Sequence, residues 1–179
     1  MAKETIVINL LGEPGVGKTK AMAEIFAKLK AKGIDAEMVS EFAKELVYEN
    51  RGETMKDEQY IYAKQAHRLF RVYGKVDVIV TDRPLILTII YNNLYGKKSA
   101  ALDALVLEEF NSYNNINYYL HRTEHEYQHN GRLQDETEAQ QINNYLRNEV
   151  CAKYNIQYTD LNVNADTCDK IVDDILKLI

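Results

Sequence analysis

The stretch LLGEPGVGKTK, residues 10–20, decides the fold, because residues 12–19 form a complete G-x-x-x-x-G-K-[ST] motif. It follows directly on TIVIN, residues 5–9, a run rich in β-branched residues that predicts a buried strand. A strand, a glycine-rich loop and a helix in this order wrap a phosphate chain with backbone N–H groups. The motif therefore predicts a phosphate-binding loop in an α/β domain.

Each part of this loop has a chemical task. The glycines let the backbone turn its N–H groups inward, and the helix that begins near Lys18 directs its positive dipole end at the phosphates. The Lys18 ammonium can reach the β- and γ-phosphates, and the Thr19 hydroxyl can ligate Mg²⁺. The loop residues expected to hold the nucleotide are Gly12, Glu13, Pro14, Gly15, Val16, Gly17, Lys18, Thr19 and Lys20.

The whole-chain composition narrows the function classes. The 179 residues, 46% hydrophobic and 27% charged, predict a single globular domain over residues 1–179. No run approaches the roughly 18 apolar residues of a membrane span. The net charge of −5 disfavours a nucleic acid as the main partner. Cys151 and Cys168 are expected to be buried thiols in a reducing compartment, which predicts a cytoplasmic protein, and a homodimer is left open.

Apolar β-rich runs alternate along the chain with helical patterns, which predicts a mainly parallel sheet covered by helices on both faces. Strands are expected at residues 5–11, 36–40, 76–81, 116–121 and 156–161. Helices are expected at residues 18–32, 42–49, 57–73, 84–94, 99–110, 136–154 and 167–179. Pro84 suits the first turn of the fourth helix, since proline costs least there. The fold class is therefore α/β, with three layers.

A second carboxylate is needed near the phosphate loop to hold the metal. VDVIVTDRP, residues 76–84, supplies Asp82 at the carboxyl end of an apolar strand, where ligands bind in open α/β sheets. Asp82 is therefore expected to ligate Mg²⁺ together with Thr19. Arg83 would point into the same crevice, where its guanidinium can clamp a phosphate or hydrogen-bond a sugar.

The second strand ends in SEFAKELVYE, residues 40–49, and places Glu41 about where an acceptor hydroxyl would meet the γ-phosphate. A carboxylate there can orient and deprotonate that hydroxyl. The alternative is that Glu41 only favours the start of the next helix, as acidic residues do. Whether Glu41 or Asp82 is the base stays open at this point.

The helix DEQYIYAKQAHRLFRVY, residues 57–73, is the candidate wall of an acceptor pocket. Tyr62, Gln65 and Arg68 share one broad face at helical spacing. The Gln65 amide could read a base edge, and the Tyr62 ring could stack on one. The alternative is that these side chains pack in the core.

The polar segment HRTEHEYQHNGRLQDETE, residues 121–138, is interpreted as a lid over about residues 122–136. Arg122 and Arg132 could neutralise charge that develops on a transferred phosphoryl group. His121, His125 and His129 recur every four residues, but solvated histidines are favoured over a metal site. In DLNVNADT, residues 160–167, residues 162–165 would pack against an adenine.

Taken together, these stretches resemble the P-loop nucleoside and nucleotide kinases. The chain is most similar to the AAA-domain group related to the ribosylnicotinamide kinase part of the bacterial NAD-biosynthesis regulator. The stretches that carry the resemblance are GEPGVGKT (12–19), SEFAKEL (40–46), AKQAHRLFR (63–71), VIVTDRPLILTIIYNNLYG (78–96) and NGRLQDETEAQQINNYL (130–146). No adenylyltransferase part accompanies them in this sequence.

The resemblance implies a P-loop NTPase fold with five parallel strands in the order 2-3-1-4-5. It also implies ATP as donor, Mg²⁺, and a nucleoside or nucleotide acceptor. The catalytic residues are then Lys18, Glu41, Asp82, Arg83, Arg122 and Arg132, and the acceptor contacts are Glu41, Tyr62, Gln65, Arg68 and Arg83. A kinase of a nucleic-acid hydroxyl, a ribosylnicotinamide kinase and a nucleotide-dependent switch remain as alternatives.

Overall fold

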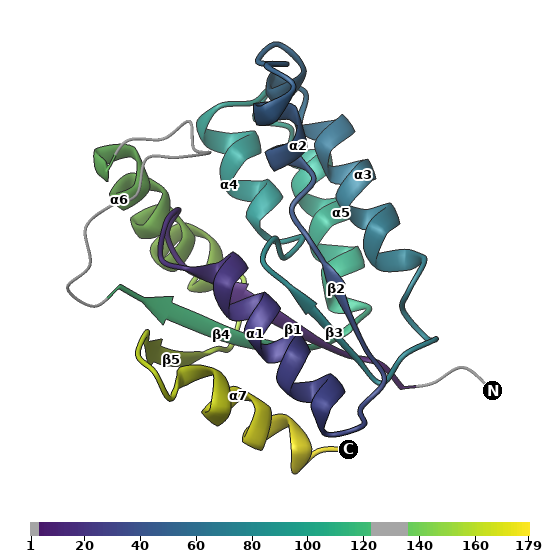
Figure 1. The fold of residues 1–179 in the computed structure, drawn as a ribbon. Coiled ribbons are helices and arrows are strands. Elements are labelled where there is room, and N and C mark those ends of the chain that lie inside the picture. Colours follow the sequence, from purple (N-terminus) through teal and green to yellow (C-terminus); the bar gives the residue numbers. More distant parts are fainter. Residues whose placement is uncertain (1–3, 123–135) are drawn as a thin grey trace.

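The computed structural model describes residues 4–122 and 136–179. Five strands form one sheet, in which every pair of neighbours is parallel (Figure 1). The observed order β2-β3-β1-β4-β5 confirms the expected topology. The strands are β1 (Ile6–Leu11), β2 (Ala36–Val39), β3 (Val78–Thr81), β4 (Asn114–His121) and β5 (Thr159–Asn162).

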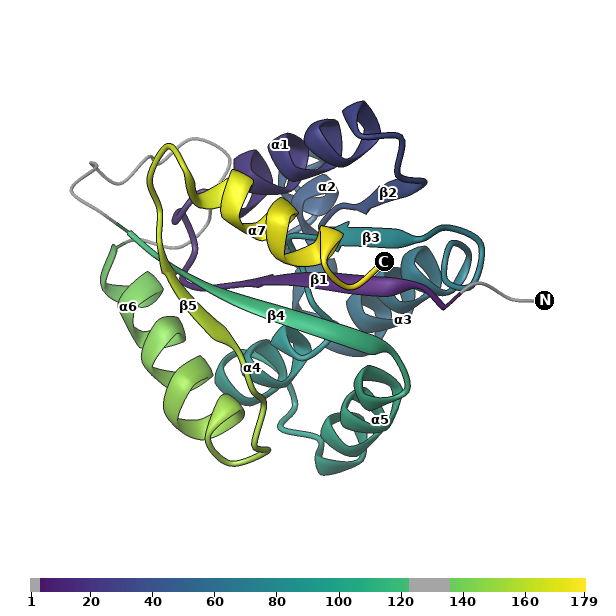
Figure 2. The same ribbon diagram turned by 90° about the horizontal axis from the view of Figure 1, so that it is seen from below.

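Helices cover both faces of this sheet, as the view in Figure 2 shows, so the three-layer α/β/α expectation is also confirmed. One layer holds α1 and α7, and the other holds α3, α4, α5 and α6. The helices are α1 (Lys18–Ala31), α2 (Ala43–Tyr48), α3 (Glu58–Phe70), α4 (Leu87–Leu94), α5 (Ala100–Asn111), α6 (Glu136–Tyr145) and α7 (Thr167–Leu176). A short 3₁₀-helix, η1 (Thr54–Lys56), precedes α3, and a π-helix, η2 (Leu146–Cys151), continues α6.

The strand β1 divides the core into two parts, because successive side chains of a strand point to opposite faces. Ile6, Ile8 and Leu10 pack with α1 and α7, whereas Val7 and Leu11 pack with the helices of the opposite layer. All six residues of β1 are buried. This burial on both faces is typical of a central parallel strand, and it fixes the loop that follows at the carboxyl edge of the sheet.

A polar cluster lies in the sheet between β1 and β4. The Asn9 amide donates to Asn115 Oδ1 at 2.8 Å and to Asn117 Oδ1 at 2.9 Å. Asn117 is the register partner of Asn9, and its own amide donates to the Gln157 carbonyl at 2.9 Å. Asn9 is buried, so these bonds replace the water that its amide loses on folding.

Two elements begin three residues later than expected. The fourth helix begins at Leu87 rather than Pro84, because Pro84 and Leu85 accept bonds from the backbone three residues ahead and form a tight turn first. The strand β5 is only four residues long and begins at Thr159.

Cys151 and Cys168 are buried, as expected, and burial raises the pKa of each thiol to about 11. None of the helices among the described residues is long and apolar enough to cross a membrane.

Candidate active site

The phosphate loop joins β1 to α1 at the carboxyl edge of the sheet. Gly12, Gly15 and Gly17 have φ of 128°, 89° and 102°, a region that disfavours any side chain. A Cβ added at Gly12 would also lie 2.6 Å from the Leu120 carbonyl oxygen of β4. The loop therefore approaches β4 so closely that only glycine fits at residue 12.

We expect Gly12→Ala to destabilise the fold by about 1–3 kcal/mol, because it combines a strained φ with a clash against backbone. Gly52→Ala is the matched control, since a Cβ at Gly52 meets no atom within 4 Å. Urea denaturation of both variants measures the difference. Equal midpoints for the two variants would contradict the close approach to β4.

The Lys18 ammonium lies inside the curve of the loop. Its Nζ donates to the Gly12 carbonyl at 2.9 Å and to the Glu13 carbonyl at 2.8 Å. Burial lowers the pKa of Lys18 to about 8, although the nearby carboxylates of Glu41 and Asp82 raise it. The cation is therefore held by the loop itself, at the position where phosphates would bind.

This pKa has a measurable consequence for ATP affinity. Lys18 is charged below pH 8 and loses its proton above it, while bound phosphates favour the charged form. ATP affinity is therefore expected to be flat below that pH and to fall above it, by up to about tenfold per pH unit. Calorimetric titration with ATP across this range measures the curve. The control is Lys18→Arg, whose guanidinium stays charged, so a wild-type curve as flat as the variant's would contradict the assignment.

Asp82 links the phosphate loop to the end of β2. Its Oδ2 accepts from the Thr19 hydroxyl at 2.6 Å, and its Oδ1 accepts from the Glu41 backbone N–H at 3.0 Å. Asp82 follows β3 directly and is buried. Thr81 reinforces the same edge, because its hydroxyl donates to the Val39 carbonyl at 2.7 Å. The ends of β2 and β3 and the start of α1 are thus joined at one carboxylate.

These two groups also fit a magnesium ion. Mg²⁺ takes oxygen ligands and is usually bound by one or two protein groups together with phosphates and water. The Thr19 hydroxyl and the Asp82 carboxylate offer two such oxygens beside the loop, already in contact with each other. The described residues contain no cluster of three or more ligating side chains, so they offer no closed cage for the metal.

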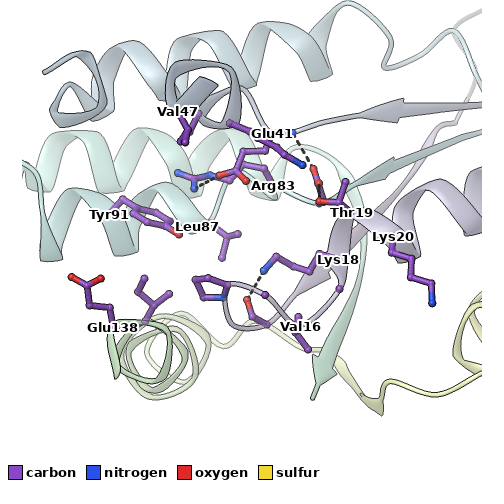
Figure 3. Close-up of a pocket in the computed structure, with 18 of the residues that line it drawn as sticks. Val16, Lys18, Thr19, Lys20, Glu41, Val47, Arg83, Leu87, Tyr91 and Glu138 are labelled. Atoms are coloured by element: carbon purple, nitrogen blue, oxygen red, sulfur yellow. Dashed lines mark hydrogen bonds and ion pairs between the residues drawn. The ribbon is translucent and has the colours of Figure 1, made fainter. Parts of the chain in front are cut away.

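Arg83 lies across the crevice from the loop and is held from three sides. Its Nη1 donates to Glu41 Oε1 at 3.1 Å, its Nη2 lies 3.8 Å from Glu58 Oε2, and its guanidinium lies 4.2 Å from the centre of the Tyr91 ring. Burial would lower the pKa of Arg83, but Glu41, Tyr91 and Glu58 raise it, and the net direction is upward. The guanidinium therefore stays charged, and Figure 3 shows it beside Glu41.

Burial raises the pKa of Glu58 to about 7, although the Arg83 charge opposes this. Burial likewise raises the pKa of Tyr91 to about 12. Both groups line the same cavity, which has a volume of about 980 Å³. The cavity runs from the phosphate loop past Glu41 and Arg83 to α4 and α6, where Leu87 and Glu138 face it (Figure 3). Its size and its mixed lining suit a small-molecule ligand site.

The donor side of the cavity holds further expected residues. Arg122 follows β4, and its Nη2 lies 2.9 Å from Glu13 Oε1 and 3.5 Å from the Pro14 carbonyl. Of residues 162–165, expected near an adenine, Val163, Asn164 and Ala165 line the cavity. Arg132 and most of the expected lid lie outside the described residues, as do His125 and His129. His121 lies instead against Asp160 of β5.

Three expected acceptor contacts on α3 lie outside the cavity. The Tyr62 hydroxyl donates to Glu109 within the core. The Gln65 side chain accepts from the Phe42 N–H at 2.9 Å and donates to the Ser40 carbonyl at 3.3 Å. Arg68 bonds the Ser40 carbonyl at 3.2 Å and packs on the Phe42 ring. This face of α3 therefore holds the segment around Glu41 in place, because both ends of the Gln65 amide are engaged by backbone.

The sequence reasoning missed the residues of α3 and α4 that do line the cavity. Glu58 and Ile61 face it from α3, and Leu87, Tyr91 and Tyr95 face it from α4. Glu58 carried one usable signal: it is an acidic residue one position after a helix N-cap, Asp57, which already satisfies the first turn. Tyr91 lies about one turn into α4, after the Asp82–Arg83 pair, but its direction depends on where α4 packs.

Two solved structures of NadR share this fold. The complex of NadR with NR has a TM-score of 0.67 and 17% sequence identity, covering 97% of this chain and 51% of the NadR chain. The complex of NadR with NAD and AMP-PNP has a TM-score of 0.66 and 14% identity, covering 97% and 49%. This chain therefore spans about half the length of the NadR chains.

Thymidylate kinase from Ehrlichia chaffeensis is similar over nearly its whole length. The TM-score is 0.64 at 12% identity, with 97% of this chain and 98% of that chain covered. These likenesses show that this chain shares the fold of NadR and thymidylate kinase. The comparison with curated proteins gives no match. The AAA domain family matches residues 7–167, most of the sequence, and the chain belongs to that family.

Proposed function

We propose that this protein is an ATP- and Mg²⁺-dependent kinase that transfers the γ-phosphoryl group to a hydroxyl of a small acceptor, a nucleoside or nucleotide. The observation that carries the proposal is the double use of Asp82. One of its oxygens bonds the Thr19 hydroxyl of the phosphate loop, and the other bonds the backbone N–H of Glu41. A single carboxylate thus ties the donor side of the cavity to the acceptor side.

On the donor side, the loop N–H groups and Lys18 would hold the β- and γ-phosphates. Arg122 lies beside the loop through Glu13 and Pro14, where it can balance charge on the transferred group. Thr19 and Asp82 would hold Mg²⁺, which when bound neutralises charge on the phosphate oxygens. Positioning and charge balance are the main needs of phosphoryl transfer, and these residues supply both.

On the acceptor side, Glu41 is the better candidate for the base. Both oxygens of Asp82 are engaged, by Thr19 and by the Glu41 N–H. Glu41 accepts a hydrogen bond from Arg83 through Oε1, and its Oε2 makes no hydrogen bond within residues 4–122 and 136–179. Its side chain is about one-third exposed to the cavity, so an acceptor hydroxyl can reach it. Glu41 would take the proton of the hydroxyl while Arg83 fixes the carboxylate.

The similar solved structures, those of NadR and thymidylate kinase, support a kinase rather than a switch. Thymidylate kinase is a kinase by name, and NadR was solved with NR and with AMP-PNP. The cavity extends well beyond the phosphate loop and has a lining of its own on α3, α4 and α6. A switch that only hydrolyses its nucleotide does not need a pocket for a second substrate.

The test is an ATP-consumption screen with nucleosides, nucleoside monophosphates, ribosylnicotinamide and oligonucleotides as acceptors. We expect a small acceptor to stimulate ADP formation and to gain a phosphate by mass spectrometry. Lys18→Ala serves as the negative control for ADP formation, because it removes the cation of the phosphate loop. Stimulation by oligonucleotides alone would move the function to nucleic-acid ends, and stimulation by no acceptor would favour the switch.

A further inference from the structure

The acceptor side of the cavity contains two buried polar atoms that lack a hydrogen-bond partner among the described residues. These are Glu58 Oε2 and Arg83 Nη2. Both side chains line the cavity, with only 7% of Glu58 and 4% of Arg83 exposed. Buried polar atoms are nearly always hydrogen-bonded in native proteins, because burial removes the water that would otherwise bond them. Glu58 Oε2 and Arg83 Nη2 form an ion pair with each other but no hydrogen bond, so each can still form a hydrogen bond with a ligand in the cavity.

The geometry of the couple indicates which group would fill it. The two atoms lie 3.8 Å apart, which is too far for a direct hydrogen bond. A single oxygen between them could lie at hydrogen-bond distance from both. Above about pH 7, where Glu58 is ionised, this oxygen would have to donate to the Glu58 carboxylate and accept from the Arg83 guanidinium. A hydroxyl does both, whereas an amide N–H only donates and a carbonyl or phosphate oxygen only accepts.

The position of the couple relates it to the reacting group. Arg83 bonds Glu41 through Nη1 and faces Glu58 through Nη2, so its planar guanidinium lies between the two carboxylates. The Tyr91 ring lies against the guanidinium and limits its rotation. A hydroxyl at Glu41 and a second hydroxyl at Glu58 would then belong to one molecule that spans a single guanidinium, as neighbouring groups of a sugar can.

The charges around the acceptor side argue against a phosphorylated acceptor. Glu41, Glu58 and Glu138 line this part of the cavity, and the buried cation Arg83 already faces two of these carboxylates. Lys44 also lines the cavity from α2 but is half-exposed, and Lys56 is exposed and paired with Glu53. Above about pH 7, where Glu58 is ionised, a phosphate monoester beside it would place like charges together in a site shielded from water.

We propose that Glu58 and the Nη2 of Arg83 form a binding site for a second hydroxyl of the acceptor, and that they select an unphosphorylated sugar alcohol such as a nucleoside over its monophosphate. The site rests on the proposed function, because Glu41 would hold the hydroxyl that reacts. Glu58 is a binding residue in this scheme. It takes no proton from the reacting hydroxyl, so the chemistry at Glu41 does not require it.

The test measures acceptor binding by calorimetry and phosphorylation by mass spectrometry. The probes are ribosylnicotinamide and the four common ribonucleosides, each compared with its 5′-monophosphate and, for the ribonucleosides, with the 2′- and 3′-deoxy forms. The wild type is expected to bind at least one unphosphorylated probe more tightly than its monophosphate. Loss of one sugar hydroxyl should weaken binding by about 10- to 100-fold, because a buried charged group is left unpaired. Glu58→Leu should remove this difference between the sugar and deoxy forms.

Glu108→Gln, an exposed carboxylate on α5, is the matched control and should keep the wild-type preference. Equal binding of the sugar and deoxy forms to the wild type would overturn the inference, since a bridging water would then suffice. Preference for the monophosphates, or binding of none of these probes, would overturn it as well. Failure of the proposed function is separate: it would appear as binding without Lys18-dependent phosphorylation.

Discussion

Replacing Lys18 by alanine is expected to lower acceptor-dependent ATP turnover by about 100- to 1,000-fold, the usual effect of losing one preorganised charge at a transition state. The ammonium is held at 2.9 and 2.8 Å from the carbonyls of Gly12 and Glu13, so its position does not depend on the substrate. Initial rates of ADP formation at saturating acceptor measure the loss.

Lys30→Ala is the matched control, because Lys30 is exposed in the last turn of α1 and does not line the cavity. This variant should retain wild-type turnover. The melting temperature of Lys18→Ala should not fall, since removing a buried ammonium removes its desolvation cost. Full turnover by Lys18→Ala would show that the loop does not position the transferred phosphate.

Replacing Glu41 by glutamine is expected to lower kcat by about 100- to 10,000-fold, the range for loss of a general base. The amide keeps the shape of the side chain, so the affinity for ATP should stay within a factor of about two. Glu49→Gln, an exposed substitution at the end of α2, is the charge-matched control. Pre-steady-state measurement of the phosphorylated product separates the chemical step from product release.

The opposite outcome is equally informative about the acceptor. A phosphate acceptor is already ionised and needs no base, so Glu41→Gln would then be nearly as active as the wild type. In that case Arg83→Gln would be the more damaging change, because Arg83 would hold the acceptor phosphate. Wild-type activity in Glu41→Gln would therefore exclude a hydroxyl acceptor at this site.

The local parts of the fold could be predicted from the sequence. The glycines of residues 12–17 and the apolar run before them follow short-range rules, and the structure has the loop between β1 and α1 as expected. Asp82 and Arg83 were found because the carboxyl ends of parallel strands meet at one edge. The strand order came from the resemblance, since the alternation of strands and helices alone is compatible with several orders.

The face of α3 could not be predicted, for a physical reason. Helical spacing shows which residues share a face, but it does not show what that face meets. The face with Gln65 meets the backbone of Ser40 and Phe42, whereas Glu58, the first residue of α3, reaches the cavity. A buried polar residue with a tertiary backbone partner has no local signature, so Gln65 looked like a ligand contact.

The asparagine cluster between β1 and β4 has a consequence for the precision of the donor side. The Asn9 amide is satisfied only in the observed register, where Asn115 and Asn117 both reach it. A slip of β4 by one residue would leave the Asn9 amide without its partners. It would also move Arg122 about 3.3 Å along the sheet, away from Glu13. The pairing register of β1 and β4 therefore sets the distance between Arg122 and the phosphate loop, where the nucleotide would bind.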